Sequence, residues 1–408
     1  MNPASLPESV RTPTLSICVP TYNRARYLEC MLADLAANIG GLGFSYELLI
    51  GDNGSEDDTA EVVRAYEGQL AIRYFRRPGN LGPFHNFSQL LAAAQGKYFV
   101  YLADDDLLMI EVLGRYIAHL EANPGLGAVF APWYIHDRVT GEDLELFYSV
   151  PEETRIEARD HRSLFAWLVN GHVFPEIYVV KTSLARAVTV GANDFAFFYF
   201  VQIAAMVDRA AVTFCPEPFY RQVSRYFDDD SRSQTGIEEV KIGWDRYRGG
   251  LEYILAKFAS QLSPEDLEWC RRAIDRFVQI RMHVALRLRT LDGRDWVDNY
   301  YIANRLRCTG GDSLLPAPYQ SYRVNAALEY LCGLQPFFPR PATVAYYKDD
   351  APHVLAQAQG FAAADLLALE DRSEPLSDDV IIVGSRDRLP TDTNAFVISE
   401  AELLARFP

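Results

Sequence analysis

Three consecutive carboxylates, Asp104, Asp105 and Asp106, follow a short apolar run at residues 98–102. Like charges at the end of a buried strand repel one another and lose hydration, so a fold needs a compensating group there. Divalent cations take oxygen ligands, often with a phosphate as co-ligand. A competing interpretation is that an aspartate caps a helix over residues 106–120, where Asp is favoured. A cap needs one carboxylate rather than three, so the triplet favours a metal site.

Polar residues also follow the three apolar runs that precede this triplet. They are Thr21, Tyr22 and Asn23 after residues 15–19, Asp52, Asn53, Gly54 and Ser55 after residues 46–50, and Asn80 and Gly82 after residues 72–75. A carboxylate in the second loop suits the N–H groups of a base, and an aromatic ring in the first suits stacking. Asn, Gly, Asp and Ser are common turn residues, which accounts well for Asn53 and Gly54. A turn accounts poorly for Tyr22 and for the acid triplet.

Segments with helical periodicity alternate with the apolar runs. The spacing predicts strands over residues 15–19, 46–50, 72–75 and 98–102, and helices over residues 24–37, 60–66 and 84–95. This alternation is typical of an α/β fold with a doubly wound, mostly parallel sheet. Such a sheet binds ligands beyond the carboxyl ends of its strands, where all four polar clusters fall. The sequence has neither GxGxxG nor GxxxxGK[ST], so the usual dinucleotide and P-loop phosphate cradles are missing.

Four motifs in this order resemble the nucleotide-binding half of the family 2 glycosyltransferases. They are Val19-Pro-Thr-Tyr-Asn-Arg24, Asp52-Asn-Gly-Ser-x-Asp-Asp-Thr59, Asn80-Leu-Gly82 and Leu102-Ala-Asp-Asp-Asp106, within a resemblance that covers about residues 13–225. The resemblance implies an inverting enzyme with the GT-A fold, a nucleotide-sugar donor and a divalent metal, Mn²⁺ or Mg²⁺. It also implies a base contact by Asp52 and metal binding by the triplet.

The resemblance transfers two sets of residues to this chain. The donor-binding set is Pro20, Thr21, Tyr22, Asn23, Asp52, Asn53, Asn80, Gly82, Asp104 and Arg225, and the metal ligands are Asp104, Asp105 and Asp106. One departure affects the second set, because many relatives read Leu-Asp-x-Asp-Asp where this chain has Ala103. In that register Asp105 is the main metal contact, and the literal Asp104-x-Asp106 frame is the alternative. Loss of one acid implies altered ribose contacts or weaker metal binding.

Inverting transfer also needs a general base that takes the proton of the acceptor hydroxyl. In the family this base opens a helix on the acceptor side, and Asp194 fits because residues 195–207 read as a buried helix. A plain helix N-cap is the other interpretation of Asp194, and both can hold. The rival acids are Asp208, Glu217, Asp228, Asp229 and Asp230.

Several cations and histidines are weaker candidates. Arg221 and Arg225 follow an expected closing strand over residues 210–220 and could contact the diphosphate, although structural ion pairs explain them equally well. His85 lies beside the Asn80–Gly82 loop, where an ordinary helix-surface role is the stronger interpretation. His172 precedes an expected strand in the acceptor half and could bond an acceptor sugar.

The composition of the chain restricts the class of ligand and the cellular compartment that we expect. The 408 residues carry a net charge of −16, which argues against nucleic-acid binding because the phosphate backbone demands Lys and Arg. Six cysteines show no CxxC spacing and nothing marks a disulfide framework, so a reducing cytoplasm is expected. We find no signal-peptide pattern and no run of about 20 apolar residues that would span a membrane.

The chain changes character beyond about residue 230. Helices are expected over residues 237–259 and 264–291, and the second carries six arginines between residues 271 and 289 against one acid. This basic helix could contact anionic lipid at the inner face of the membrane, or a lipid-linked acceptor, and an oligomer is compatible with the surface. An exposed face that pairs with acids of the catalytic domain explains it slightly better. Further on, strands over residues 343–347, 380–383 and 395–399 and a helix over residues 353–359 indicate a small α/β unit.

We therefore predict a catalytic domain over residues 1–230, a helical region over 231–335 and a C-terminal α/β unit over 341–408, with Pro336–Pro341 as a linker. Within the first, residues 13–106 would bind the nucleotide sugar and residues 107–230 the acceptor. The predicted activity is metal-dependent, inverting transfer from a UDP- or dTDP-sugar to a saccharide or lipid-linked acceptor in bacterial surface polysaccharide synthesis. The alternatives are a non-catalytic nucleotide-sugar-binding relative and a sugar nucleotidyltransferase, whose Gly-rich basic loop is lacking after the first strand.

Overall fold

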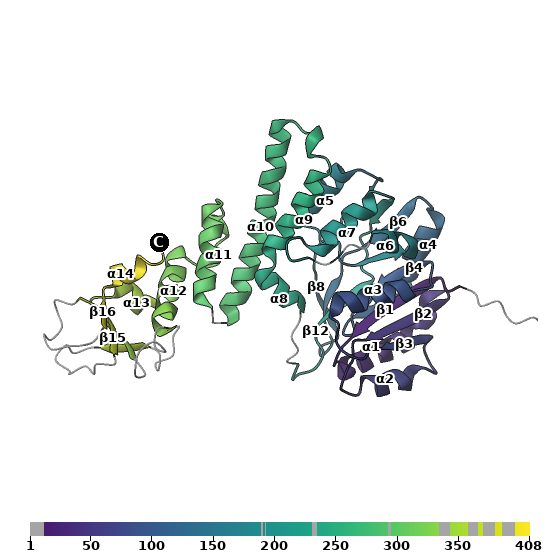
Figure 1. Ribbon diagram of the computed structural model, residues 1–408, viewed down its shortest axis with the longest axis horizontal. Helices are drawn as coiled ribbons and strands as arrows, with labels where there is room; N and C mark the ends of the chain where they lie inside the picture. Colours follow the sequence, from purple (N-terminus) through teal and green to yellow (C-terminus); the bar gives the residue numbers. More distant parts are fainter. Residues whose placement is uncertain are drawn as a thin grey trace, which may run out of the picture. The chain divides into compact units, whose positions relative to one another are not determined.

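The computed structural model describes residues 12–188, 191, 193–230, 235–292, 295–333, 343–357, 366–369, 380–385 and 396–408. The chain divides into two compact units (Figure 1). Unit 1 comprises residues 1–233 and 245–274, and unit 2 comprises residues 234–244 and 275–408. The predicted boundaries at residues 230 and 335 stay predictions, and the predicted linker at residues 336–341 lies outside the described part of the chain.

Unit 1 is built on a sheet whose strand order is β3-β2-β1-β4-β10-β6-β11-β9. The first four strands in the chain are β1 (Leu15–Thr21), β2 (Tyr46–Asp52), β3 (Ile72–Arg76) and β4 (Tyr98–Tyr101), and they run parallel. The remaining strands are β6 (Leu126–Phe130), β9 (Thr154–Ile156), β10 (Tyr178–Lys181) and β11 (Ala211–Phe214), with β10 antiparallel to both of its neighbours. The predicted α/β class with a mostly parallel sheet is confirmed.

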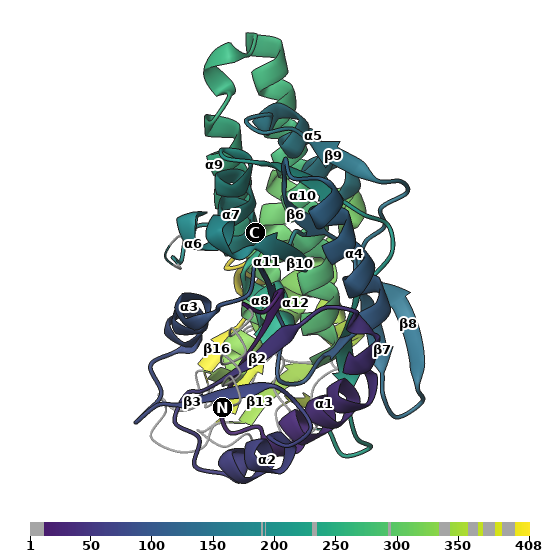
Figure 2. The same ribbon diagram turned by 90° about the vertical axis from the view of Figure 1, so that its right-hand side faces the viewer.

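The helices between these strands cover both faces of the sheet. Helices α1 (Ala25–Asn38) and α2 (Thr59–Tyr66) lie on one face, and α3 (Pro83–Ala93) lies on the other (Figures 1 and 2). Helix α1 buries Leu28, Met31, Leu32 and Leu35, which recur at the spacing of one helix face. On the opposite face, α3 approaches β2 so closely that a Cβ atom on Gly51 would lie 2.4 Å from Asn86 Oδ1.

A second sheet has the order β5-β12-β7-β8. Its strands are β5 (Leu107–Leu108), β7 (Tyr134–Asp137), β8 (Glu142–Leu146) and β12 (Tyr220–Arg225), and the β7–β8 hairpin lies at the edge of unit 1 (Figure 2). Because β5 pairs with β12, α4 (Ile110–Ala122) begins later than predicted and Met109 is its N-cap. The helix-cap explanation of the acid triplet is therefore wrong. The expected strand over residues 210–220 ends at Phe214 as β11, and β12 begins at Tyr220.

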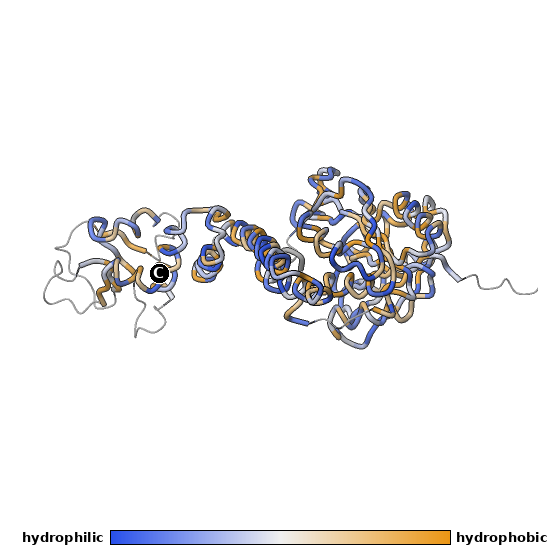
Figure 3. Tube along the Cα trace, turned by 90° about the horizontal axis from the view of Figure 1, so that it is seen from above, coloured by the Kyte–Doolittle hydropathy of each residue, from blue (hydrophilic) through white to orange (hydrophobic). Residues whose placement is uncertain are grey.

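The acceptor half of unit 1 contains α5 (His161–Gly171), α6 (Thr182–Val188) and α7 (Phe198–Val207). The single helix expected over residues 237–259 is wrong, because it divides at Gly243 into α8 (Thr235–Ile242) and α9 (Trp244–Ala256). Helix α10 (Pro264–Asp292) follows the predicted bounds closely. Hydrophobic and hydrophilic residues alternate along its coil, as in an amphipathic helix (Figure 3).

Unit 2 contains α11 (Trp296–Cys308), α12 (Tyr319–Gly333), α13 (Pro352–Gln357) and α14 (Glu400–Leu404). Its parallel sheet has the order β14-β13-β15-β16, with β13 (Thr343–Tyr347), β14 (Leu366–Leu369), β15 (Val380–Val383) and β16 (Phe396–Ile398). Strand β14 had no counterpart in the sequence prediction.

The basic stretch of α10 is partly internal. Arg281 and Arg289 are buried, and the Arg289 side chain donates to Asn299 Oδ1 at 2.7 Å and to Asp298 Oδ2 at 3.0 Å. Arg289 is therefore not on an exposed face, and these partners belong to α11 rather than to the predicted catalytic domain, so for Arg289 the expected pairing with acids of that domain is wrong. No helix in the described ranges is long and apolar enough to cross a membrane.

Candidate active site

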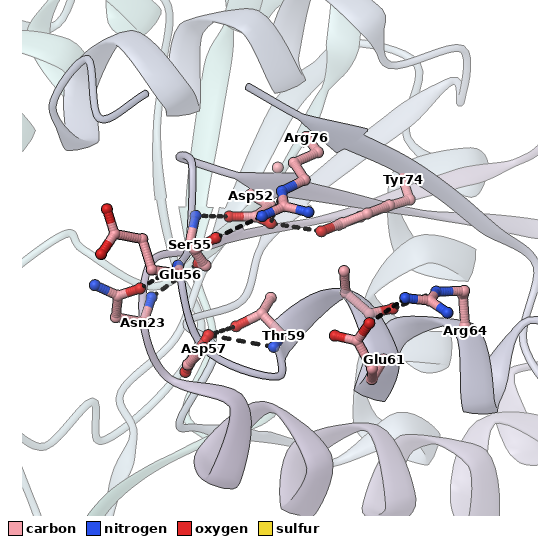
Figure 4. Close-up of polar contacts among 12 residues, drawn as sticks. Asn23, Asp52, Ser55, Glu56, Asp57, Thr59, Glu61, Arg64, Tyr74 and Arg76 are labelled. Carbon is pink, nitrogen blue, oxygen red and sulfur yellow. Dashed lines mark hydrogen bonds and ion pairs between the residues drawn. The ribbon is translucent and has the colours of Figure 1, made fainter. Parts of the chain in front are cut away.

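The first two polar loops are joined through Asn23 (Figure 4). Its backbone N–H donates to Ser55 Oγ at 2.9 Å, and its side-chain Oδ1 accepts from the N–H of Glu56 at 2.8 Å. Asn23 adopts the left-handed conformation with φ of 52°, which Asn tolerates better than most residues. Asp57 extends the connection, since its carboxylate accepts from the N–H of Ala25 at 2.9 Å. The loops after β1 and β2 therefore form one hydrogen-bonded surface.

Asp52 lies beneath this surface and is only 1% exposed. Its carboxylate accepts from the N–H of Ser55 at 2.7 Å and from the Tyr74 hydroxyl, and Arg76 Nε lies 3.7 Å away (Figure 4). Burial, and then the bond to Asp52, raise the pKa of Tyr74 well above its usual value. Sequence reasoning missed Tyr74 and Arg76; the available signal was their position on β3, whose carboxyl end lies beside that of β2. The predicted base contact of Asp52 stays a prediction.

The third loop is tied to the second by two asparagines. Asn53 Nδ2 donates to Asn80 Oδ1 at 2.7 Å, and the N–H of Leu81 donates to Asn53 Oδ1 at 3.0 Å. Gly54 has φ of 84°, and a Cβ atom on it would lie 2.7 Å from Cα of Gly79. Both features require glycine at this position. The structure thus brings Asn53, Gly54 and Asn80 together, as predicted from the parallel strand order.

The first loop leaves one aromatic ring accessible. Tyr22 is 40% exposed, whereas its neighbour Thr21 is buried at the end of β1. Tyr22 therefore presents a ring at the carboxyl edge of the sheet, where a planar ligand can stack on it.

The acid triplet follows β4 at the same edge. Asp104 is buried, and its pKa is raised to about 7. Burial is the main cause and the neighbouring charge of Asp105 the second, whereas Arg24 lowers the pKa. Arg24 forms an ion pair with Asp105, and its Nη1 lies 3.7 Å from Asp104 Oδ1. Two carboxylates thus lie beside this guanidinium, and a further cation next to them would favour their charged forms.

Asp106 has a different environment from its two neighbours. Its Oδ2 accepts from the Tyr220 hydroxyl at 2.8 Å, and its Oδ1 accepts from the N–H of Val223 at 2.8 Å. Both oxygens therefore anchor β12, and of the three predicted ligands the two whose environment fits a metal best are Asp104 and Asp105.

The carboxylate pair fits a metal ion whose coordination is completed by oxygens of the substrate. In the described ranges no group of three or more His, Cys, Asp or Glu side chains is arranged to hold an ion. Mg²⁺ commonly binds through one or two carboxylates together with substrate phosphates rather than in a protein cage. The pair Asp104 and Asp105 matches that mode of binding, with the phosphates supplied by the substrate.

The arginines after the closing strand pair with the β7–β8 hairpin. Arg221 Nε and Nη2 each lie 2.8 Å from the Asp143 carboxylate, and Arg225 Nη2 lies 2.7 Å from Asp137 Oδ2. These ion pairs favour the structural interpretation of both residues. The predicted diphosphate contact of Arg225 stays a prediction.

Asp194 lies in an exposed turn ahead of α7. The expected helix start at residue 195 is wrong, because Asn193 Oδ1 first accepts from the N–H groups of Phe195 and Ala196, at 2.9 and 2.8 Å, and forms a turn. Helix α7 begins only at Phe198. Asp194 is therefore not the residue that caps this helix, so the plain N-cap interpretation is wrong as well.

The rival acids have partners elsewhere. Asp208 lies 2.6 Å from Lys257 Nζ, and Glu217 lies 2.5 Å from Arg115 Nη2. In the third rival group, Asp230 Oδ1 accepts from the Tyr27 hydroxyl at 2.9 Å, and Asp229 lies 3.4 Å from Arg26. These contacts give structural roles to Asp208, Glu217, Asp229 and Asp230, and the base role of Asp194 stays a prediction.

The turn that carries Asp194 rests on α9. The N–H of Phe197 donates to the backbone oxygen of Arg246 at 2.8 Å. A Cβ atom on Gly249 would lie 1.9 Å from the backbone oxygen of Phe195. Sequence reasoning missed this support, since nothing local connects residue 195 to residue 249.

The two histidines occupy ordinary structural positions. His85 is exposed on α3 beside Gln89. His172 is the left-handed C-cap of α5, with its ring 5.4 Å from that of Phe174. Their suggested sugar contacts stay predictions.

A pocket of about 260 Å³ opens beside these loops. Pro20 and Tyr101 from the ends of β1 and β4, Phe84 and Phe87 from α3, Phe198 from α7 and Glu176 contribute to its lining. The pocket thus touches strand ends that carry predicted donor residues and the helix that follows Asp194.

Residues 16–169 match the family model described as Glycosyl transferase family 2. Over 178 residues the chain is 32% identical to the abequosyltransferase RfbV of Salmonella typhimurium, covering 43% of this chain and 46% of that protein. Over 121 residues it is 32% identical to the GalNAc(5)-diNAcBac-PP-undecaprenol beta-1,3-glucosyltransferase of Campylobacter jejuni, covering 29% and 37%. The matched stretches thus span less than half the length of these two relatives.

Two solved structures are similar over much of the chain. The 1–349 fragment of TarS from S. aureus, in complex with UDP-GlcNAc, has a TM-score of 0.43 at 15% identity and covers 76% of this chain and 90% of that one. The mannosyltransferase PcManGT of Pyrobaculum calidifontis, in complex with GDP-Man and Mn²⁺, has a TM-score of 0.42 at 17% identity and covers 79% and 88%.

Proposed function

Because residues 16–169 form a glycosyl transferase family 2 domain, we propose that this chain is an inverting glycosyltransferase. It moves a sugar from a nucleoside-diphosphate donor to a hydroxyl group of a saccharide or lipid-linked saccharide. UDP- and dTDP-sugars are the favoured donors, and bacterial surface polysaccharide synthesis is the favoured process. The proposal includes a cytoplasmic location, with peripheral contact at the membrane when the acceptor is lipid-linked.

The observation that carries this proposal is the hydrogen-bonded edge formed by the loops after β1, β2 and β3. Asn23 joins the first loop to the second and Asn53 joins the second to the third, at 2.9 and 2.7 Å. The carboxylates of Asp104 and Asp105 follow β4 at that same edge. An aromatic ring, a buried acid and a carboxylate pair are thus gathered where parallel sheets bind ligands.

The relatives support the choice of reaction class. Two matched proteins are named as an abequosyltransferase and a glucosyltransferase, and the second name includes an undecaprenol-linked saccharide. By that analogy, a lipid-linked saccharide is a candidate acceptor for this chain.

Each group has a distinct role in the proposed single displacement. Asp104 and Asp105 would hold Mn²⁺ or Mg²⁺, which when bound neutralises charge on the leaving diphosphate. Tyr22 stacks on the base, and the Asn53–Asn80 pair orders the loop beneath the donor. Asp194 takes the proton from the acceptor hydroxyl as that oxygen attacks the anomeric carbon.

The test is a thermal-shift series with UDP, GDP, dTDP, CDP and ADP, each with and without Mn²⁺. A ligand that binds only the folded protein raises its melting temperature. We expect one nucleotide to stabilise the full chain strongly, in the presence of Mn²⁺ only, and Asp105→Ala to abolish that shift.

A matched control is Asp228→Asn, which removes a carboxylate from the exposed loop after β12 and should keep the shift. Stabilisation without turnover of any donor would favour the non-catalytic relative, which the Ala103 departure keeps open. No metal-dependent shift with any of the five nucleotides would contradict the proposed site.

A further inference from the structure

Three phenylalanine rings form one wall of the pocket beside the donor loops. Phe84, Phe87 and Phe198 face one another, with ring centroids 5.9 Å apart for Phe84 and Phe198 and 6.5 Å apart for Phe87 and Phe198. Tyr101 continues this wall, since its ring lies 6.0 Å from that of Phe87. Rings from two helices and one strand therefore surround the same space.

Polar groups in this pocket are few. Among the described residues that line it, Glu176 is the one with a charged side chain. Tyr178 also lines the pocket, but its hydroxyl donates to Gln202 Oε1 at 3.0 Å. Tyr101 and Tyr199 also line the pocket. A sugar in this space would thus meet one carboxylate, the phenol groups and the hydrocarbon of the phenylalanine rings.

The position of the pocket connects it with the transferred sugar. Tyr101 ends β4 three residues before Asp104, Pro20 directly precedes Thr21, and Phe198 begins α7 four residues after Asp194. If the proposed function holds, the diphosphate lies near Thr21 and Asp104, and Asp194 is the general base. The sugar must lie between the diphosphate and the base, and residues close in sequence to both positions line this pocket.

A hydroxyl group pressed against Phe84, Phe87 and Phe198 would lose water without gaining a hydrogen-bond partner, which is costly. A methyl group in the same place would gain from burial. We propose that the pocket selects a 6-deoxyhexosyl donor, whose C6 methyl group lies against this phenylalanine wall. Glu176 accepts a hydrogen bond from one of the remaining hydroxyls. This inference rests on the proposed function and narrows its substrate class.

The test compares donors that differ only at C6. The full chain with Mn²⁺ is titrated calorimetrically with the 6-hydroxy and 6-deoxy forms of UDP-, dTDP-, GDP- and CDP-hexoses, in both the gluco and the manno series. In at least one series we expect the deoxy donor to bind about tenfold more tightly than its hydroxylated partner, because no partner meets the extra hydroxyl. In Phe84→Gln, which supplies an amide to the wall, that ratio should fall toward one.

Leu144→Gln is the matched control, because it replaces an apolar side chain that is 56% exposed on the edge strand β8. It should keep the ratio of the unaltered chain. Binding of the free nucleoside diphosphate by each variant shows that its donor loops are folded. Diphosphate binding without a preference for the deoxy form in any series would overturn the inference and leave the proposed function standing. Failure of every nucleotide and donor to bind would overturn both.

Discussion

Three adjacent aspartates of the same type have three different environments in this protein. Asp106 accepts hydrogen bonds from β12, and Asp105 pairs with Arg24. Asp104 is buried beside Asp105, and its pKa is raised to about 7 by that burial and that neighbour. A carboxylate of this kind gains from an added cation, so the first two positions of the triplet are where a metal–diphosphate pair would stabilise the site most.

The same distinction by environment applies to the acids of the acceptor half. We expect Asp194→Asn to lower donor turnover by about 100- to 10,000-fold, because loss of a general base has effects of that size. Nucleotide affinity should not change, since Asp194 lies outside the donor loops. The measurement is release of the nucleoside diphosphate from the donor, with water as acceptor. Asp208→Asn serves as the comparison, and an equal loss in that variant would contradict the assignment.

Glu47 is a buried carboxylate with a structural role, and it is 5% exposed. It accepts from Ser16 Oγ at 2.5 Å and from the N–H of Gly96 at 3.1 Å, and it pairs with Arg73. Burial alone would raise the pKa of Glu47, but the hydrogen bonds from Ser16, the N–H of Gln95 and Arg73 outweigh it and lower the pKa. This carboxylate therefore ties β1, β2 and β3 to the turn before β4.

We expect Glu47→Gln to reduce the free energy of unfolding by about 1–3 kcal/mol at pH 7, as for a lost charged hydrogen-bond partner. A lowered folded-state pKa gives stability that is present above the unfolded pKa of about 4.3 and lost as the pH falls through the folded value. The difference between the two chains should therefore shrink below about pH 4. Urea unfolding across this range measures it. Glu61→Gln, at an exposed pair with Arg64, should show little difference at any pH.

At the scale of elements, a helix outside the predicted donor loops supports the turn of the candidate base. Helix α9 meets the Phe195–Phe197 turn through Gly249 and the backbone oxygen of Arg246. In Gly249→Ala the new methyl group would collide with the Phe195 carbonyl, so the turn must move. We expect donor turnover to fall while nucleotide binding and the pH profile keep their shape. Gly68→Ala, where a Cβ atom meets nothing within 4 Å, is the control. Unchanged turnover in Gly249→Ala would contradict this positioning role.

The elements that sequence predicted well are those whose signal is local. Strands β1 to β4 and helices α1 to α3 each carry their own apolar periodicity, and the Gly- and Asn-rich turns between them fix their bounds. The predicted start of α4 was wrong because residues 107–108 pair with β12, more than 100 residues away. The turn of Asn193 likewise shortened α7, through side-chain hydrogen bonds that periodicity does not record.

The site shows the same division. The convergence of Tyr22, Asp52, Asn80 and the acid triplet at one edge followed from the parallel strand order. The partners of those residues did not, because Tyr74, Tyr220 and Val223 come from strands that are joined to them only by the fold. The roles of Asp106 and Arg225 depend on such partners. Sequence could therefore identify these residues as candidates, but it could not tell a structural role from a role in the reaction.

At the scale of the whole molecule, the chain has two units with separate cores. In unit 1 the core lies around the sheet that carries the donor loops, and in unit 2 it lies in part around α11 and α12. Buried Arg289 holds Asn299, which is fully buried, and Asp298 at the start of α11. Units with cores of their own can unfold separately, and a ligand stabilises only the unit that binds it.

We therefore expect two calorimetric transitions in the full chain. A nucleoside diphosphate with Mn²⁺ should raise the midpoint temperature of one of them. Arg289→Ala should reduce the free energy of unfolding for the other transition by about 1–3 kcal/mol, because it leaves the buried Asn299 carbonyl without that donor. Arg287→Ala, two residues away and exposed on the same helix, is the matched control and should leave both transitions in place. A single transition that both the nucleotide and Arg289→Ala displace would mean that the units unfold together, and that the basic helix contributes directly to the stability of the catalytic sheet.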